Sequence, residues 1–121
     1  MGLPCPQDGL YYFSSHTASW EEAQRFCKLL NADLVVINSS EEKKYLHVDM
    51  KNTCWIGLHD SVEEGKWHWV DGTDYDSTVK FWRSGQPNGN RNENCAAMTS
   101  DGEWHDWPCS SRHRLICEKS V

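Results

Sequence analysis

The sequence predicts a single α+β domain stapled by disulfide bonds, and three observations support this. The chain has 121 residues, a length that suits one domain with a modest hydrophobic core. Helical patterns come first and short strand-like runs follow. Six cysteines, an even number in so short a chain, indicate an oxidising compartment and a disulfide framework. We therefore expect one secreted, extracellular domain over residues 1–121.

The first elements are a short strand and a helix. Residues 11–13 (Tyr-Tyr-Phe) predict an aromatic strand. Apolar residues then recur at spacings of three and four, as on one face of a helix: Trp20, Ala23, Phe26, Cys27 and Leu30. Ser19 precedes this stripe and Glu22 lies three residues later, which is the pattern of a capping box. The helix should therefore begin directly after Ser19.

A buried strand and a second helix follow. Residues 34–37 (Leu-Val-Val-Ile) are rich in β-branched side chains and predict a strand inside the core. Ser39 and Glu42 repeat the capping signal, and we expect a helix that runs from there toward Met50.

From residue 53 the pattern changes to short strands. The predicted strands are residues 55–58, 67–70, 96–98 and 115–117. Between them, residues 71–94 are rich in Gly, Asp, Asn and Ser and have little periodicity. A long irregular segment in a compact domain is usually functional or disordered. Cys95, Trp104 and Cys109 bracket its far end, which favours an ordered loop.

Composition excludes several functions. The net charge of -6 argues against nucleic-acid binding, because phosphates need cationic partners, whereas it is compatible with a cation site. No run of the chain is long and apolar enough for a membrane span. The chain has no CxxC or HExxH motif, so the sequence gives no sign of a zinc site. It also shows no pairing of a nucleophile with a base that would indicate a catalytic site.

Four motifs of the second half occur together in the order and spacing of a known family. They are residues 55–58 (Trp-Ile-Gly-Leu), 82–88 (Trp-Arg-Ser-Gly-Gln-Pro-Asn), 93–95 (Glu-Asn-Cys) and 104–106 (Trp-His-Asp), the last followed by Cys109. With Cys27 and Cys117 they resemble the C-type lectin domain over nearly the whole chain. The resemblance implies a double-loop α+β fold with two helices, small antiparallel sheets and a long calcium-binding loop. It also implies binding without catalysis.

The resemblance also implies two disulfides, Cys27 with Cys117 and Cys95 with Cys109. Two cysteines, Cys5 and Cys54, are then left over. The usual N-terminal bridge of longer members is absent, because its second cysteine is Leu10 here. We expect Cys5 to pair with Cys54 within one chain, and bridging between two chains of a homodimer is the alternative.

The expected function is calcium-dependent carbohydrate binding. By resemblance, the calcium ligands are Gln86, Asn88, Glu93 and Asp106, whose carboxylate and amide oxygens suit this hard cation. In the family, the proline between the first two ligands is cis. Sugar hydroxyls complete the calcium shell and bond to the same side chains, so the expected partners are glycans on cell or microbial surfaces.

Two positions depart from the family pattern. His105 stands where calcium-binding members usually have Asn, and an imidazole is a poor ligand for a hard cation. Either a water takes its place in the shell or His105 bonds a sugar hydroxyl. Gln86 with Asn88 is a hybrid of the mannose-type and galactose-type motifs. We lean to mannose-type ligands, because Asn88 matches that pattern.

The resemblance suggests further roles. Asp60, Glu64 and Asn94 fall on the positions of an auxiliary calcium site. Of the tryptophans, Trp107 is the candidate for sugar contact, whereas most others should lie in the core or anchor loops, namely Trp55, Trp67, Trp69 and Trp82. The alternative function is a calcium-independent protein-ligand domain, since His105 could mark a decayed site.

Overall fold

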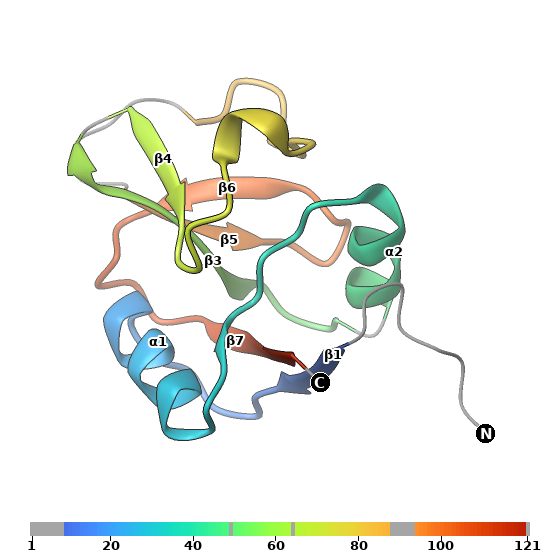
Figure 1. Ribbon diagram of the computed structural model, residues 1–121, viewed down its shortest axis with the longest axis vertical. Helices are drawn as coiled ribbons and strands as arrows, with labels where there is room; N and C mark the ends of the chain where they lie inside the picture. The colour runs from blue at the N-terminus through green and yellow to red at the C-terminus, as the bar shows by residue number, and fades with distance from the viewer. Residues whose placement is uncertain (1–8, 49, 64, 88–93, 121) are drawn as a thin grey trace.

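The computed structural model describes residues 9–48, 50–63, 65–87 and 94–120, and it has the predicted α+β architecture (Figure 1). The elements in order are β1 (Gly9–Phe13), α1 (Trp20–Leu29), β2 (Asp33–Leu34), α2 (Ser40–Val48), β3 (Cys54–Glu63), β4 (Lys66–Trp69), the single-turn 3₁₀ helix η1 (Tyr75–Ser77), β5 (Cys95–Met98), β6 (Trp104–Trp107) and β7 (Arg114–Ser120). Figure 1 shows α1 and α2 at opposite sides of the strands.

The strands form one mixed sheet in the order β1-β7-β3-β5-β6, with β2 paired to β7 and β4 to β3. The first and last strands lie side by side and antiparallel (Figure 1). Most strand pairs are antiparallel, as expected, and one is parallel: β3 and β7 pair at Cys54↔Arg114 and Trp55↔Leu115. This contact is parallel because residues 108–113 carry the chain from β6 to the edge of β3 before β7 begins.

Both predicted helix starts are confirmed. The Ser19 hydroxyl accepts a hydrogen bond from the Glu22 backbone N–H at 3.3 Å, and the Glu22 carboxylate accepts one from the Ser19 N–H at 3.1 Å. These two bonds satisfy amides that a helix otherwise leaves open at its first turn. The Ser39 hydroxyl likewise accepts from the Glu42 N–H at 3.1 Å, and α2 begins at the next residue.

The predicted strand over residues 34–37 is mostly wrong, although these residues are buried. Only β2 (Asp33–Leu34) pairs as a strand. At the next residue the backbone bonds to two different strands. The Val35 N–H donates to the Ile116 carbonyl of β7, and the Val35 carbonyl accepts from the Gly57 N–H of β3. Sequence reasoning also missed β6, whose Trp-His-Asp-Trp composition lacks the β-branched signal of a strand.

The tryptophans anchor the core and the long segment, as predicted. Trp55 and Trp104 are fully buried, and the Trp55 indole donates to the Ala18 carbonyl at 2.8 Å. Trp69 at the end of β4 and Trp82 further along the chain hold the segment after β4, because their indole N–H groups donate to Thr78 Oγ1 at 3.2 Å and to the Tyr75 hydroxyl at 2.8 Å. Trp67 is also buried.

Both disulfides implied by the resemblance are present. Cys27–Cys117 ties α1 to β7 over 90 residues, and Cys95–Cys109 closes a 14-residue span around β6. Cys54 is buried and has no disulfide partner among the described residues. Its predicted partner, Cys5, lies outside the described residues, so the Cys5–Cys54 pairing stays a prediction.

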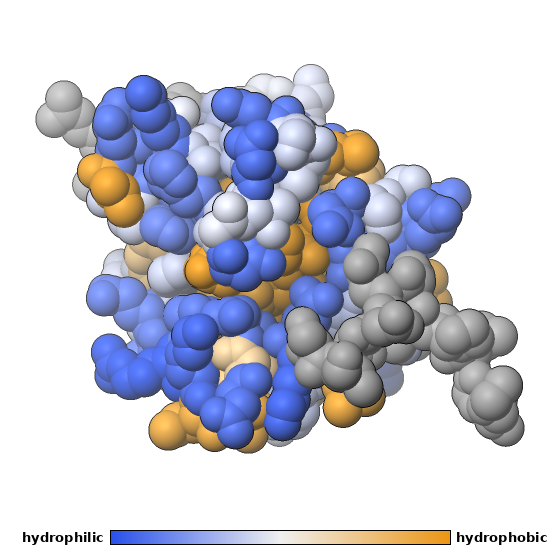
Figure 2. Space-filling view, in the orientation of Figure 1, coloured by the Kyte–Doolittle hydropathy of each residue, from blue (hydrophilic) through white to orange (hydrophobic). Residues whose placement is uncertain are grey.

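The surface and the helices are those of a small globular domain. The face in Figure 2 is mostly hydrophilic, with an apolar area near its centre. Neither α1 nor α2, with ten and nine residues, is long enough to span a membrane, and the same holds for every other helix in the part of the chain described here.

Candidate functional site

The candidate site begins where the segment after η1 lies along β6. The Trp104 N–H donates to the Phe81 carbonyl at 2.9 Å, and the Arg83 N–H donates to the Trp104 carbonyl at 3.0 Å. Past this pairing, the chain turns back through a bond from the Gln86 N–H to the Arg83 carbonyl at 2.8 Å. The Gln86–Pro87 peptide bond that follows is cis, as the resemblance implied. Gln86 is thereby held beside β6.

Gln86 and Asp106 are the two main-site residues that the structure describes, and it brings them together. The Gln86 side-chain oxygen Oε1 accepts a hydrogen bond from the Asp106 N–H at 3.3 Å. Asp106 is only 4% exposed and pairs with Ala96 of β5. The other two predicted ligands, Asn88 and Glu93, lie outside the described residues. The site therefore has a buried carboxylate with an amide oxygen beside it.

His105 lies on the other face of β6. Side chains alternate along a strand, and the burial of β6 alternates in the same way, with Trp104 and Asp106 buried and His105 and Trp107 partly exposed. The His105 ring lies 6.2 Å from the Trp107 ring, which in turn lies 4.6 Å from that of His113. His105 is thus grouped with aromatic side chains and separated from Asp106.

The predicted auxiliary site also comes together in part. The Asp60 N–H donates to the Asn94 carbonyl at 2.9 Å, so these two residues are neighbours although 34 positions separate them in the chain. Asp60 is 2% exposed, and its Oδ2 accepts from the Gly65 N–H at 2.8 Å. Within the described residues, Asp60 Oδ1 and Asn94 Oδ1 are buried and have no hydrogen-bond partner. Glu64 lies outside those residues.

The two buried oxygens without a described hydrogen-bond partner, Asp60 Oδ1 and Asn94 Oδ1, are suitable ligands for a cation. A buried polar atom without a partner costs free energy, about 1 to 3 kcal/mol for a neutral group and more for a charged one. A hard cation relieves this cost, because calcium binds carboxylate and amide oxygens of this kind. The residues at Asp60 and Asn94 are therefore suited to calcium. Across the described ranges, no three His, Cys, Asp or Glu side chains cluster as a metal site would need, so any such site draws on amide oxygens or further residues.

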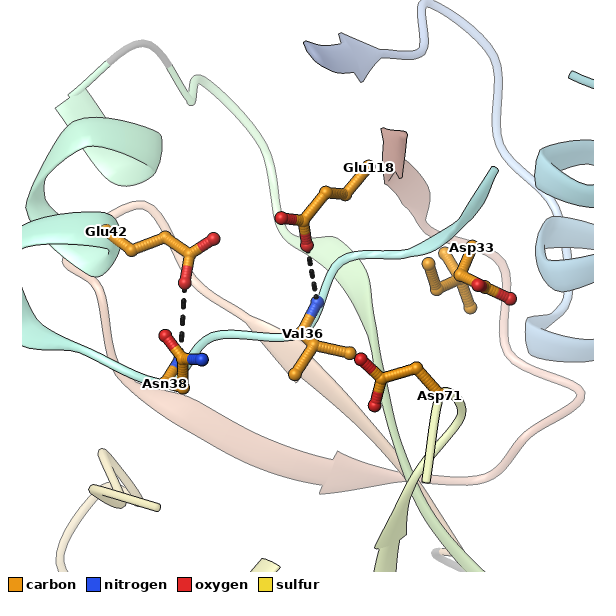
Figure 3. Close-up of a pocket in the computed structure, with 7 residues that line it drawn as sticks. Asp33, Val36, Asn38, Glu42, Asp71 and Glu118 are labelled. Carbon is orange, nitrogen blue, oxygen red and sulfur yellow. Dashed lines mark hydrogen bonds between the residues drawn. The ribbon is translucent and has the colours of Figure 1, made fainter. Parts of the chain in front are cut away.

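An acidic hollow, which sequence reasoning missed, lies between α2, β7 and the chain before α2 (Figure 3). Its volume is about 240 Å³, and four carboxylates line it: Asp33, Glu42, Asp71 and Glu118. Glu42 is fully buried, accepting from the Tyr11 hydroxyl at 2.6 Å and the Asn38 N–H at 3.2 Å. The capping signal at Glu42 gave no hint of this, because a capping box directs the glutamate carboxylate to the N-cap N–H, whereas the Glu42 carboxylate accepts from Tyr11 and Asn38.

The carboxylates in this hollow repel one another. Glu118 accepts from the Val36 N–H at 3.3 Å (Figure 3). Burial, with the Glu42 carboxylate nearby, nonetheless raises the pKa of Glu118 to about 7. Burial likewise raises the pKa of Glu42. Proton uptake in this hollow is therefore favoured in the folded state.

Comparisons with known proteins agree with the fold and the motifs. Residues 16–119 match the family model of the Lectin C-type domain. Asialoglycoprotein receptor 1 of the rat is 45% identical over 92% of this chain, and the aligned region is 41% of that protein. The chain thus spans about two fifths of the length of this relative.

Solved structures are similar across the whole fold. The mouse scavenger receptor C-type lectin carbohydrate-recognition domain superposes with a TM-score of 0.88 at 38% identity, covering 94% of this chain and 90% of that one. A calcium-independent type II antifreeze protein also reaches a TM-score of 0.88, at 30% identity, with coverage of 93% and 87%. Fold, disulfides and motifs thus point in one direction, and the chain belongs to the C-type lectin domain family.

Proposed function

We propose that this domain binds glycans through calcium, with Gln86, Asn88, Glu93 and Asp106 as ligands of the main ion. The observation that carries calcium binding is at the auxiliary site: Asp60 Oδ1 and Asn94 Oδ1, beside the segment that enters β5, are buried and have no hydrogen-bond partner among the described residues. Bound calcium would supply open coordination positions for sugar hydroxyls. The protein supplies ligands held in place, which lowers the entropy cost of binding.

The fixed parts of the site support this assignment. Asp106 and Gln86 are held by β6 and by the bond between them, so neither must be ordered when a ligand arrives. Cys95–Cys109 constrains the same region, since it bridges the start of β5 and the residues after β6. We propose that Asp60, Glu64 and Asn94 hold an auxiliary calcium ion next to the first.

His105 has a different role in this proposal. Because β6 turns its side chain to the face of Trp107, we do not assign it as a calcium ligand. A water then completes the shell, or His105 bonds a sugar hydroxyl directly. Trp107 is partly buried, and its exposed part is the surface on which we expect sugar contact.

The sugar preference follows from the two amides. Gln86 and Asn88 each offer an N–H₂ donor and an oxygen acceptor, which suits hydroxyls of either orientation. We propose mannose-type ligands because of Asn88. The relative named for asialoglycoproteins makes desialylated glycoproteins the competing class to test. Such glycans lie on cell or microbial surfaces, and the disulfides favour a secreted or extracellular setting.

A second candidate is calcium-independent binding of a protein ligand. It is favoured by the replacement at His105 and by the likeness to a calcium-independent antifreeze protein. We place it second, because Asp60 Oδ1 and Asn94 Oδ1, which are buried and have no hydrogen-bond partner among the described residues, suit a cation better than a protein surface.

The proposal can be tested with Asp106→Asn and Glu93→Gln. Each change removes one negative charge from the main site and leaves the core and both bridges in place. We expect calcium affinity to fall by at least about tenfold, the effect of losing about 1.4 kcal/mol, and glycan binding to disappear. Calorimetric calcium titration and retention on mannose and asialoglycoprotein resins give the two readouts.

Asp76→Asn is the matched control, since Asp76 is an exposed carboxylate on η1. It should leave both readouts unchanged, and all three variants should keep the thermal midpoint of the calcium-free wild type within a few degrees. Normal glycan retention by Asp106→Asn would place the sugar elsewhere and refute the assignment.

A further inference from the structure

A basic hollow lies at the start of β7, outside the proposed glycan site. Arg112, His113 and Arg114 are consecutive, in a chain with 18 acidic and 12 basic residues. They line a hollow of about 340 Å³ together with Thr17, Asn52 and Thr53. None of the residues described along this lining is a carboxylate. This concentration of positive charge is unexpected in an acidic protein.

An adjoining hollow extends the same charge pattern. Its volume is about 90 Å³, it shares Asn52 and Arg114 with the first, and it adds Lys51 and Ser14. Its described lining also contains no carboxylate. Arg114 therefore stands at the junction of two hollows that together hold three permanent cations.

The two arginines differ in how their charge is compensated. The Arg112 guanidinium donates to the Thr17 carbonyl at 2.8 Å and pairs with the Glu22 carboxylate at 3.3 Å, which fixes it at the rim. Arg114 is partly buried, and no carboxylate among the described residues lies within ion-pair distance of it. A charge removed from water without a partner is unfavourable, so this position is stabilised when an anion enters.

We propose that this hollow binds a single tetrahedral oxyanion, a sulfate or phosphate group, with Arg114 and Arg112 as its charged donors. Guanidinium groups bond such oxygens in pairs, and the hydroxyl and amide groups of Thr17, Thr53 and Asn52 offer further donors. The hollow has room for one such group. The net charge of -6 opposes the approach of an extended polyanion, which is why the ligand is a single group.

This site shares no proposed calcium ligand with the glycan site, although His113 on its lining packs against Trp107, the residue expected to contact sugar. It contains neither Asp60, Gln86, Asn94 nor Asp106, and its donors are cations that repel calcium. Anion binding should therefore persist in EDTA, when calcium-dependent glycan binding is lost. The two proposals can fail separately.

The test is a nuclear magnetic resonance titration of the folded domain in EDTA at constant ionic strength. The probes are inorganic sulfate, inorganic phosphate, N-acetylglucosamine 6-sulfate and unmodified N-acetylglucosamine, with chloride as the balancing anion. We expect saturable shifts of the backbone amides at residues 17, 53 and 112–114 with the charged probes and none with the neutral sugar. Tighter binding of the sulfated sugar than of free sulfate would identify an ester as the ligand, and the reverse order would identify the free ion.

Substitutions of the two arginines test whether they bind the anion. Because Arg114 would supply charge-assisted hydrogen bonds to the anion, Arg114→Gln should weaken binding by about tenfold or more. Arg112→Gln should weaken it less, because part of that charge is already paired with Glu22. Arg25→Gln is the matched control, since Arg25 is an exposed arginine on α1, and it should bind as the wild type does.

The proposal is overturned by shifts that do not saturate, by an absence of shifts at these amides, or by equal weakening in Arg25→Gln and Arg114→Gln. If the Arg114→Gln variant does not fold, as judged by the loss of dispersed amide signals, then Arg112→Gln and Arg114→Lys test the site in its place. Arg114→Lys keeps the charge but loses the paired donors, so it should bind the anion more weakly than the wild type does. Binding by both variants that is identical to wild type contradicts the site.

Discussion

The part of the molecule built on β1, α1 and β7 and the part between β4 and β6 are held in different ways. In the first, β1 pairs with β7 over five successive residues and Cys27–Cys117 joins that strand to a capped helix. In the second, the described residues from 70 to 87 contain only the three-residue turn η1 (Figure 1). The segment is held by the indole of Trp69 in β4, by the indole of Trp82 within the segment itself, and by two backbone hydrogen bonds with Trp104 of β6.

This difference separates stability from function. Backbone ladders and the long disulfide stabilise the first part, which contributes no residue to the main candidate site. The second part leaves its backbone irregular, and such loops on a rigid scaffold are the usual place for binding residues. Gln86 is positioned there by one backbone turn and one bond with Asp106, both supported by β6.

Removal of either disulfide should have the largest effect on the free energy of unfolding, and the two effects should differ between the two parts of the molecule. Replacing Cys27 and Cys117 by alanine opens a 90-residue span and should cost about 4 to 5 kcal/mol of unfolding free energy in the chain-entropy model. Replacing Cys95 and Cys109 opens a 14-residue span and should cost about 3 kcal/mol. Urea unfolding of the two double variants in EDTA measures both values.

Calcium affinity should rank the two disulfide variants in the opposite order from stability. The Cys95/Cys109 variant should lose more calcium affinity than the Cys27/Cys117 variant, provided both are measured where they remain folded, because only the short bridge constrains the region that carries Asp106. Equal calcium affinity in the two folded variants would show that the bridge near the site does not organise it.

A smaller effect should come from the acidic hollow at the first part of the molecule. The folded-state pKa of Glu118, about 7, lies above the ordinary value of 4.5, so the folded state binds more protons than the unfolded state between these pH values. The stability due to this proton is complete below about pH 4.5 and is lost as the pH rises through about 7. Glu118→Gln should flatten this pH dependence and raise stability relative to wild type near pH 8.

Thermal midpoints across this range, recorded in EDTA, measure the effect. Glu41→Gln, on the exposed side of α2, is the matched control and should keep the wild-type slope. A Glu118→Gln variant whose midpoint follows pH as steeply as the wild type would exclude Glu118 as the group responsible.

Local signals made most of the fold predictable. The capping boxes at Ser19 and Ser39 depend on residues three positions apart, and both helices begin where these signals place them. The strand predicted over residues 35–37 does not form, because the backbone of Val35 bonds to two strands, β7 and β3, that are distant in the sequence, and the Val36 N–H bonds to the Glu118 side chain. Strand β6 was missed because its pairing with β5 is set by tertiary contacts and by a buried aspartate, which no periodic pattern announces.

For the candidate site, the sequence motifs identified residues but not how the fold arranges them. Asp60 and Asn94 were placed together by resemblance, and the structure makes them neighbours. The separation of His105 from Asp106 could not be foreseen without knowing that they belong to a strand. The acidic hollow and the basic hollow both combine residues from segments that lie far apart in the chain, so neither left a motif.

The most direct test of the central proposal is glycan binding by the wild-type domain with and without calcium. On an array of mannose-terminated, galactose-terminated and desialylated glycoprotein ligands, we expect binding in millimolar calcium, its complete loss in EDTA and its return when calcium is restored. Binding of the same glycans at equal strength in EDTA would contradict the proposed role of calcium. An absence of binding to any glycan in calcium would contradict the lectin assignment itself.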